Sequence, residues 1–142
     1  MKVVDVMTKD IVSVHLDESV RNIQELFARR QFHHLMVIED DFLVGVISDR
    51  DLLNNLSPFI GHIYGERSQD LALLNRRAHQ IMTRKPIVVT AEASLEQAAR
   101  LMLDKGISCL PVVNEKGAPI GIVSSKDLLR ALVRIGQPES KK

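Results

Sequence analysis

Two short segments of the chain carry a glycine, a serine and an aspartate at the same spacing. The segments are Gly45–Asp51 and Gly121–Asp127, and each ends an apolar run and is followed by two leucines. The pattern predicts a β-strand that opens directly into a helix, with the serine and the aspartate at the junction. Helix N–H groups favour an anion there, and a carboxylate can accept hydrogen bonds from neighbouring sugar hydroxyls. The residue types therefore suit a ribose phosphate.

The same residues also have a purely structural interpretation. Serine and aspartate are common N-cap residues, because their side-chain oxygens accept hydrogen bonds from the first N–H groups of a helix. Either segment alone is more often a helix cap than a ligand site. Because the segment occurs twice, it exposes an internal repeat.

The residues around the two segments repeat as well. Met82-Thr83 repeats Met7-Thr8, and Ser94 stands at the same offset from Ser19. Each of these serines precedes an apolar stripe at helical spacing, which predicts an N-cap and an amphipathic helix. Ser94 also begins a capping-box pattern.

Each repeat is predicted to run strand, helix, strand, strand, helix. In the first repeat the elements are a strand over 11–14, a helix from about 20 to 30, hairpin strands over 34–38 and 43–47, and a helix from 48 that stops before Pro58. A unit of about 60 residues cannot bury both a helix face and a sheet face alone, so we expect the two to pack together. The predicted fold class is α+β, with the repeats packed as a pseudo-twofold pair around a cleft.

The repeats also set the predicted domain boundaries. The first repeat covers 1–56, a connector with a short helix after Ser68 covers 57–77, the second repeat covers 78–135, and 136–142 form a polar, disordered tail.

Composition narrows the function classes. The chain has 142 residues, of which 45% are hydrophobic and 26% charged, and its formal net charge is +1. Such a small charge predicts neither nucleic acid nor an anionic membrane as a partner. One cysteine, Cys109, excludes an internal disulfide framework, and no apolar run approaches the roughly 20 residues of a membrane span. The first residues lack the apolar segment of a signal peptide, so we expect a cytoplasmic protein.

The whole pattern resembles the tandem CBS-domain module, the pair of repeats first recognised in cystathionine β-synthase. The resemblance covers nearly the whole chain. It is carried by Met7-Thr8, Met82-Thr83, Leu110–Val113 and both Gly-x-x-Ser-x-x-Asp segments. The segment from Ser48 looks most like bacterial CBS proteins of acetoin utilisation.

The resemblance implies a regulatory module that binds AMP, ADP, ATP or S-adenosylmethionine and signals by a conformational change. In such modules two composite clefts hold the ligands, with the adenine against the early segment of one repeat and the phosphate and ribose against the serine and aspartate of the other. One cleft would use Met7, Asp10, Val12, Phe32, His33, Ile122, Ser124 and Asp127. The other would use Met82, Lys85, Ile87, Ile107, Ser108, Val46, Ser48 and Asp51.

Charge suggests which cleft binds more tightly. Arg50 and Lys85 accompany the Ser48–Asp51 segment, whereas Asp10 accompanies the other and would repel a phosphate. The prediction is tighter binding at Ser48–Asp51.

Other function classes stay open beside the nucleotide module. The fold can serve as an interaction scaffold without a ligand. No Walker loop, nucleophile elbow or His-Glu-x-x-His helix indicates an enzyme. His33 and His34 suggest a metal site, but neighbours on a strand point to opposite faces, so we expect one to line a cleft and the other to cap the sheet. Cys109, Met7 and Met82 are interpreted as apolar wall and core-filling residues.

Partners follow from surplus apolar surface. The amphipathic helices carry more apolar positions than one sheet face can cover, which predicts a homodimer. The residues assigned to this surplus are Phe27, Leu53, Leu101, Leu128 and Leu132. A regulatory module also needs a regulated protein, which the sequence does not identify.

Overall fold

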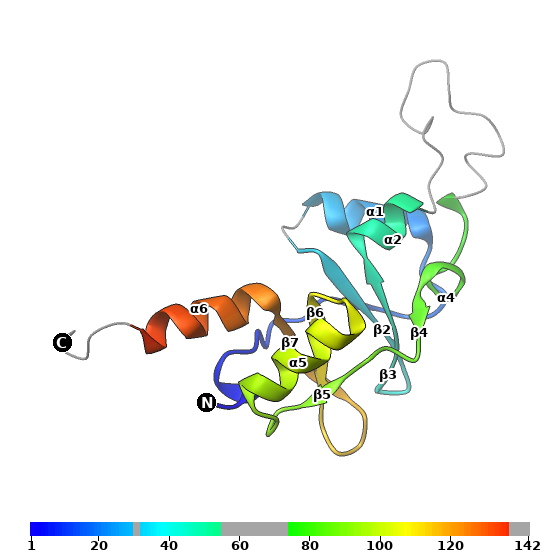
Figure 1. Cartoon of the computed structure of the whole chain (residues 1–142). Coiled ribbons are helices and arrows are strands. Elements are labelled where there is room, and N and C mark those ends of the chain that lie inside the picture. Colours follow the sequence, from blue (N-terminus) through cyan, green and yellow to red (C-terminus); the bar gives the residue numbers. More distant parts are fainter. Residues whose placement is uncertain (30–31, 55–73, 137–142) are drawn as a thin grey trace. The chain divides into compact units, whose positions relative to one another are not determined.

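The computed structural model describes residues 1–29, 32–54 and 74–136 (Figure 1). The chain divides into two compact units. The middle unit is Val12–Pro86, and the terminal unit combines Met1–Ile11 with Ile87–Lys142.

The middle unit is built on a sheet with the strand order β1-β2-β3-β4. The β1–β2 pair is parallel, whereas β2–β3 and β3–β4 are antiparallel. Its elements are β1 (Ser13–Val14), α1 (Val20–Arg29), β2 (His34–Glu39), β3 (Phe42–Ser48), α2 (Asp49–Asn54), α4 (Ala78–Ile81) and β4 (Thr83–Arg84).

Local sequence explains the turn and the helix start in this unit. Asp40 and Asp41 join β2 to β3 with φ of 51° and 68°, a left-handed conformation that aspartate tolerates and that two-residue hairpins need. Ser19 accepts a hydrogen bond from the backbone N of Asn22 at 3.2 Å, so it caps α1. The predicted hairpin and first helix are confirmed.

The terminal unit contains a sheet with the order β5-β6-β7, in which β5–β6 is parallel and β6–β7 antiparallel. The capping box predicted at Ser94 is present, since Ser94 and Gln97 exchange hydrogen bonds of 3.0 and 2.8 Å. The elements are the 3₁₀ helix η1 (Val3–Asp5), β5 (Val89–Thr90), α5 (Leu95–Lys105), β6 (Cys109–Val113), β7 (Pro119–Ser124) and α6 (Ser125–Ile135).

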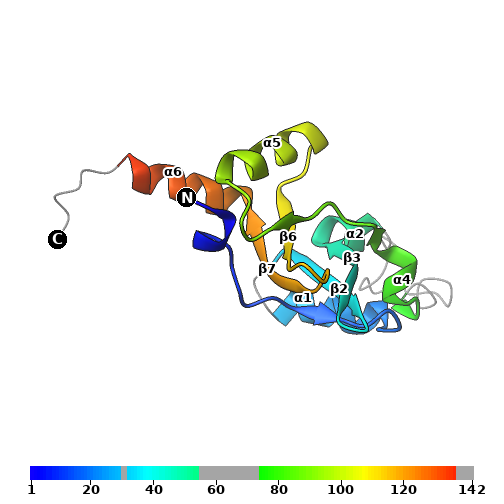
Figure 2. The ribbon, with the colours of Figure 1, turned by 90° about the horizontal axis from the view of Figure 1, so that it is seen from below.

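The Met-Thr opening of each repeat lies in the unit that contains the other repeat's hairpin. Thr8 exchanges backbone hydrogen bonds of 2.8 and 2.9 Å with Ile122 of β7, and Figures 1 and 2 show the blue N-terminal segment beside this strand. In the middle unit, Thr83 of β4 pairs with Val46 of β3 in the same way. The compact units are thus interleaved with the sequence repeats.

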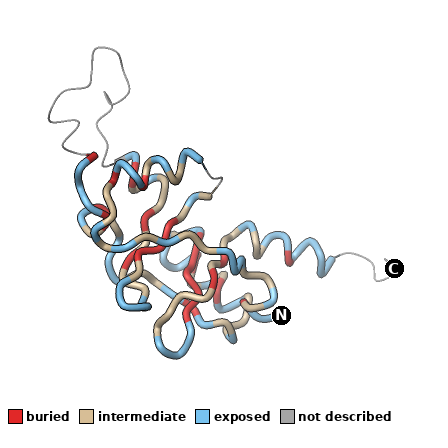
Figure 3. The backbone as a smooth tube through the Cα atoms, turned by 180° about the vertical axis from the view of Figure 1, so that it is seen from behind, coloured by how far each residue is buried: buried red, intermediate tan, exposed pale blue. Residues whose placement is uncertain are grey.

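Each unit has its own apolar core (Figure 3). The middle core contains Val20, Ile23, Leu35, Val37, Ile47, Leu52, Leu74, Ala78 and Ile81. The terminal core contains Val3, Val89, Ala98, Met102, Leu110, Val112 and Val123.

The apolar residues assigned to a dimer surface differ in exposure. Phe27 is partly buried against the middle core, and Leu101 and Leu128 are partly buried against the terminal core, so their place in a dimer surface stays a prediction. Leu53 and Leu132 are exposed as expected.

Several expectations concern segments that the structure does not describe. The end of the second helix before Pro58, the helix after Ser68 and nearly all of the tail lie outside the described residues. Within the described residues, no helix is long and apolar enough to cross a membrane.

Candidate functional site

Ser124 and Asp127 lie together where β7 opens into α6. Ser124 Oγ accepts a hydrogen bond from the backbone N of Asp127 at 3.2 Å. Oδ2 of Asp127 accepts from the backbone N and from Oγ of Ser124 at 2.9 and 3.1 Å. The other carboxylate oxygen, Oδ1, accepts from Nη1 of Arg130 at 3.3 Å. Asp127 therefore uses Oδ2 in the cap with Ser124, while Oδ1 contacts the guanidinium of Arg130.

Ser48 and Asp51 form the same arrangement where β3 opens into α2. The backbone N of Ser48 donates to Asp51 Oδ2 at 3.0 Å, and the backbone N of Asp51 donates to Ser48 Oγ at 3.0 Å. Both junctions are reciprocal caps, which confirms the structural interpretation of these residues. A ligand would have to use the oxygen lone pairs that remain.

The glycine of each Gly-x-x-Ser-x-x-Asp segment leaves room for a Met-Thr pair to approach the strand. A Cβ on Gly121 would lie 2.8 Å from Met7 Sδ and 2.9 Å from the carbonyl oxygen of Thr8. A Cβ on Gly45 would meet the side chain of Met82, with Cγ at 2.9 Å. Met7 and Met82 pack against the terminal and middle cores, so the prediction that both fill core space is confirmed.

The two adjacent histidines have different surroundings. His33 Nδ1 lies 2.9 Å from Oδ2 of Asp49, and this hydrogen bond lowers the pKa of the Asp49 carboxyl. His34 pairs with Ser48 across the hairpin, and its burial lowers the pKa of the imidazole. Among the described residues, no group of three or more histidine, cysteine or acidic side chains is placed to hold a metal ion.

Cys109 lies opposite Ser124 in the β6–β7 hairpin and is buried, as its interpretation as a wall residue requires. Burial, with a smaller contribution from the charge of Asp127, raises the pKa of the thiol to about 12. The reactive thiolate is therefore suppressed at neutral pH.

The predicted site residues are distributed over both units, and each of the two sets has members in each. In the terminal unit are Met7, Asp10, Ile87, Ile107, Ser108, Ile122, Ser124 and Asp127. In the middle unit are Val12, Phe32, His33, Val46, Ser48, Asp51, Met82 and Lys85.

Strand register shows how Lys85 lies relative to the serine of its unit. Arg84 pairs with Gly45, which lies three residues before Ser48 and so about 10 Å along the strand from the helix junction. Lys85 is the next residue and lies farther from the junction. Lys85 then leaves the strand with φ of 51°. Its charge is thus set back from the junction.

Asp10 is displaced from Ser124 in the same direction. Thr8 pairs with Ile122, and the chain then runs on antiparallel to β7, away from Ser124. The argument that Lys85 and Asp10 set the charge around a phosphate at the junctions is therefore not supported by the register.

Sequence reasoning missed Arg130, whose Nη1 lies 3.3 Å from Oδ1 of the junction aspartate Asp127. Its position one helical turn after Asp127 was the available signal, because residues three apart are neighbours on a helix surface.

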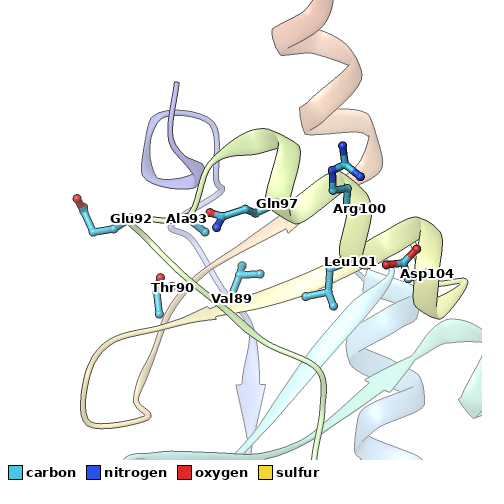
Figure 4. A pocket seen from close by; sticks show the side chains of 8 residues that line it. All are labelled: Val89, Thr90, Glu92, Ala93, Gln97, Arg100, Leu101 and Asp104. Carbon is cyan, nitrogen blue, oxygen red and sulfur yellow. The ribbon is translucent and has the colours of Figure 1, made fainter.

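A groove of about 540 Å³ lies elsewhere on the terminal unit, between α5 and the segment that contains β5 (Figure 4). Its lining residues belong to neither predicted set. They are Val89, Thr90, Glu92, Ala93, Gln97, Arg100, Leu101 and Asp104.

Known proteins share both the sequence pattern and the fold. The family model described as CBS domain matches residues 3–58 and 78–134. A CBS domain-containing protein of Dictyostelium discoideum is 32% identical over 93% of this chain and 91% of its own length. The crystal structure of CBSX2 in complex with AMP is 33% identical, with a TM-score of 0.78 over 96% of this chain and 98% of that one.

Other relatives set limits on the comparison. A putative acetoin utilization protein from Vibrio cholerae has a TM-score of 0.75 over 95% of this chain and 92% of that one, but at 23% identity it shares the fold alone. The chain spans about half the length of some relatives, such as 47% of an uncharacterized protein of Methanocaldococcus jannaschii that is 26% identical over 98% of this chain. The predicted α+β class with two repeats of this kind is confirmed, and the chain belongs to the CBS domain family as a tandem pair.

Proposed function

We propose that this chain is a regulatory module that binds an adenosine nucleotide and signals by a conformational change. AMP, ADP and ATP are the expected ligands, with S-adenosylmethionine as a related one. The observation that carries the proposal is the paired serine and aspartate at each strand-to-helix junction, in a chain that is similar along nearly its whole length to a protein solved with AMP.

The chemistry of the junctions supports a role for each residue. Asp51 and Asp127 are proposed to accept hydrogen bonds from ribose hydroxyls, and Ser48 and Ser124 to contact phosphate. The apolar residues of the two predicted sets, such as Met7 and Met82, are proposed to contact adenine. The site residues are thus proposed as two sets, with one aspartate in each.

A thermal-shift panel with AMP, ADP, ATP, NADH, S-adenosylmethionine and divalent metals tests the ligand class. A ligand at 100 times its dissociation constant stabilises the folded state by about 2.7 kcal/mol. Calorimetric titration of AMP into Asp51→Asn and Asp127→Asn then tests the sites, and each variant is expected to weaken binding. Gln97→Ala is the matched control, because it removes a reciprocal cap from α5, outside both sets.

A ligand-free interaction scaffold is the second candidate. It is favoured by the fact that the serine and aspartate of each junction already bond to each other. If no nucleotide shifts the melting temperature, the scaffold is supported and the nucleotide module is rejected. A shift with a divalent metal alone would support a metal protein instead.

The remaining proposals concern the setting in which the module acts. We propose that it is not an enzyme, that it works in the cytoplasm as a homodimer and that it controls a separate protein. The dimer is supported by the four apolar residues Leu129, Leu132, Val133 and Ile135 of α6, which are 60 to 64% exposed.

A further inference from the structure

We infer that Arg130 determines ligand specificity at the Ser124–Asp127 junction, by making it favour adenosine compounds that carry phosphate over uncharged ones. The inference rests on the proposed function. It adds which junction prefers the anionic ligand and which side chain is responsible.

The first step is the position of the guanidinium. Helical side chains lean toward the N-terminus of their helix, and Arg130 follows Asp127 by three residues. Its Nη1 reaches Oδ1 of Asp127 at 3.3 Å, so its positive charge lies beside the junction rather than along the outer part of α6.

The second step is that this guanidinium is available to a ligand. Asp127 is only 11% exposed, whereas Arg130 is 66% exposed, so the arginine lies on the solvent side of the pair. A guanidinium has five N–H donors, and the contact with Asp127 uses one of them. Exposed ion pairs are weakly held, so Arg130 can turn toward a phosphate at little cost.

The third step is the contrast with the first repeat. Its junction carries the two carboxylates Asp49 and Asp51 and the one guanidinium of Arg50, and the position that matches Arg130 is Asn54. The second junction has Lys126 and Arg130 against the single carboxylate Asp127.

Charges farther along the strands do not reverse this contrast. Lys85 and Asp10 are displaced from the junctions by the strand register. A separation of about 10 Å is comparable to the screening length of roughly 8 Å at physiological salt. The structure therefore points to Ser124–Asp127 as the junction that prefers phosphate, the opposite of the expectation from the sequence.

The test compares AMP with adenosine by calorimetry at low salt on the full chain. Arg130→Gln is expected to weaken AMP binding by about threefold, as the loss of an exposed charge implies, while adenosine affinity changes little. Arg130→Lys keeps the charge and is expected to retain the AMP preference. Arg134→Gln removes an exposed arginine one turn farther along α6 and is expected to change neither ligand.

A salt titration separates specificity from a structural role. The effect of Arg130→Gln on AMP is expected to shrink at high salt, because exposed charges are screened. The inference would be overturned if Arg130→Gln left AMP affinity unchanged, or if it weakened AMP and adenosine binding equally. Wild-type protein that binds neither compound would overturn the proposed function itself.

Discussion

At the scale of single residues, the two junctions combine structural and candidate ligand roles in the same atoms. Ser48 and Ser124 cap their helices, and the aspartate three residues later completes each capping box. Capping alone explains why these residue types occur at a helix start. Capping does not explain Gly45 and Gly121, which are required because the side chains of Met82 and Met7 pack where a Cβ would lie.

The two glycines are expected to respond differently to a methyl group. Gly121→Ala places its Cβ against the carbonyl oxygen of Thr8, a backbone atom, and should destabilise the fold by about 1–3 kcal/mol. Gly45→Ala meets only side-chain atoms of Met82. Urea unfolding should therefore show that Met82→Ala relieves the cost of Gly45→Ala, whereas Met7→Ala relieves little of the cost of Gly121→Ala. Equal relief in the two double mutants would contradict this explanation.

His34 is expected to make stability depend on pH. Because burial lowers the pKa of His34 in the folded state, the unfolded state binds more protons below the ordinary histidine value of about 6.5. The stability contributed by neutral His34 should therefore be complete above that pH, and the free energy of unfolding should fall as the pH drops below it.

Chemical denaturation between pH 8 and pH 5 measures this dependence. His34→Gln is expected to flatten the curve, because it removes the half-buried titrating group. His15→Gln, at an exposed position of the same unit, is the control and should leave the slope unchanged. A slope that survives in His34→Gln would assign the effect to another group.

At the scale of elements, short segments hold each unit together across large distances in sequence. η1 lies against the second repeat, where the backbone N of Val3 donates to the carbonyl of Ala93 at 2.8 Å and the Val3 side chain is fully buried. The segment before α4 does the same in the middle unit, where the backbone N of Val20 donates to the carbonyl oxygen of Arg76 at 2.7 Å. The openings of the repeats are thus integral parts of the sheets and cores.

The importance of the N-terminal segment can be measured with one truncated side chain. Val3→Ala is expected to destabilise the protein by about 2 kcal/mol, because it removes two buried methyl groups from the terminal core. The neighbouring substitution Lys2→Ala breaks an exposed ion pair with Glu92 and is expected to have a much smaller effect. Similar melting temperatures for Val3→Ala and wild type would show that η1 contributes little to the core.

At the scale of the whole molecule, the apolar surface of α6 supports the proposed homodimer. Ala131 is the buried residue of this helix, and Figure 3 shows most of α6 as exposed. In Figures 1 and 2 its far end extends away from the strands of its unit. An apolar helix surface of this kind is commonly covered by a partner.

Charge substitutions on α6 test the dimer. Light scattering at tens of micromolar is expected to give a dimer for the wild-type chain and a monomer for Leu132→Glu, because a carboxylate at an apolar interface stays unpaired. Leu103→Glu, at an exposed position of α5, is the control and is expected to leave the dimer intact. A wild-type monomer would reject the proposal, and loss of the dimer in the control alone would move the interface to α5.

Much of the architecture follows from the sequence by itself. The repeated Gly-x-x-Ser-x-x-Asp segments, the serine caps at Ser19 and Ser94 and the alternation of helical and strand periods predict the order of elements and the α+β class. These features are local, since caps and amphipathic periods act within a few residues and so leave a readable pattern. The caps at Ser48 and Ser124 were readable for the same reason.

The pairing of the openings and the surroundings of the junctions were decided only by the tertiary structure. η1, α4 and β4 are too short to show a period, and the sequence does not reveal that Thr8 pairs with Ile122 or that Thr83 pairs with Val46. That pairing displaces Asp10 and Lys85 from the junctions. The contact of Arg130 with Asp127 is different, because it lies within one turn of α6 and the i,i+3 spacing could have signalled it. Charge proximity depends on register and side-chain direction, which the spacing of residues along one chain does not specify.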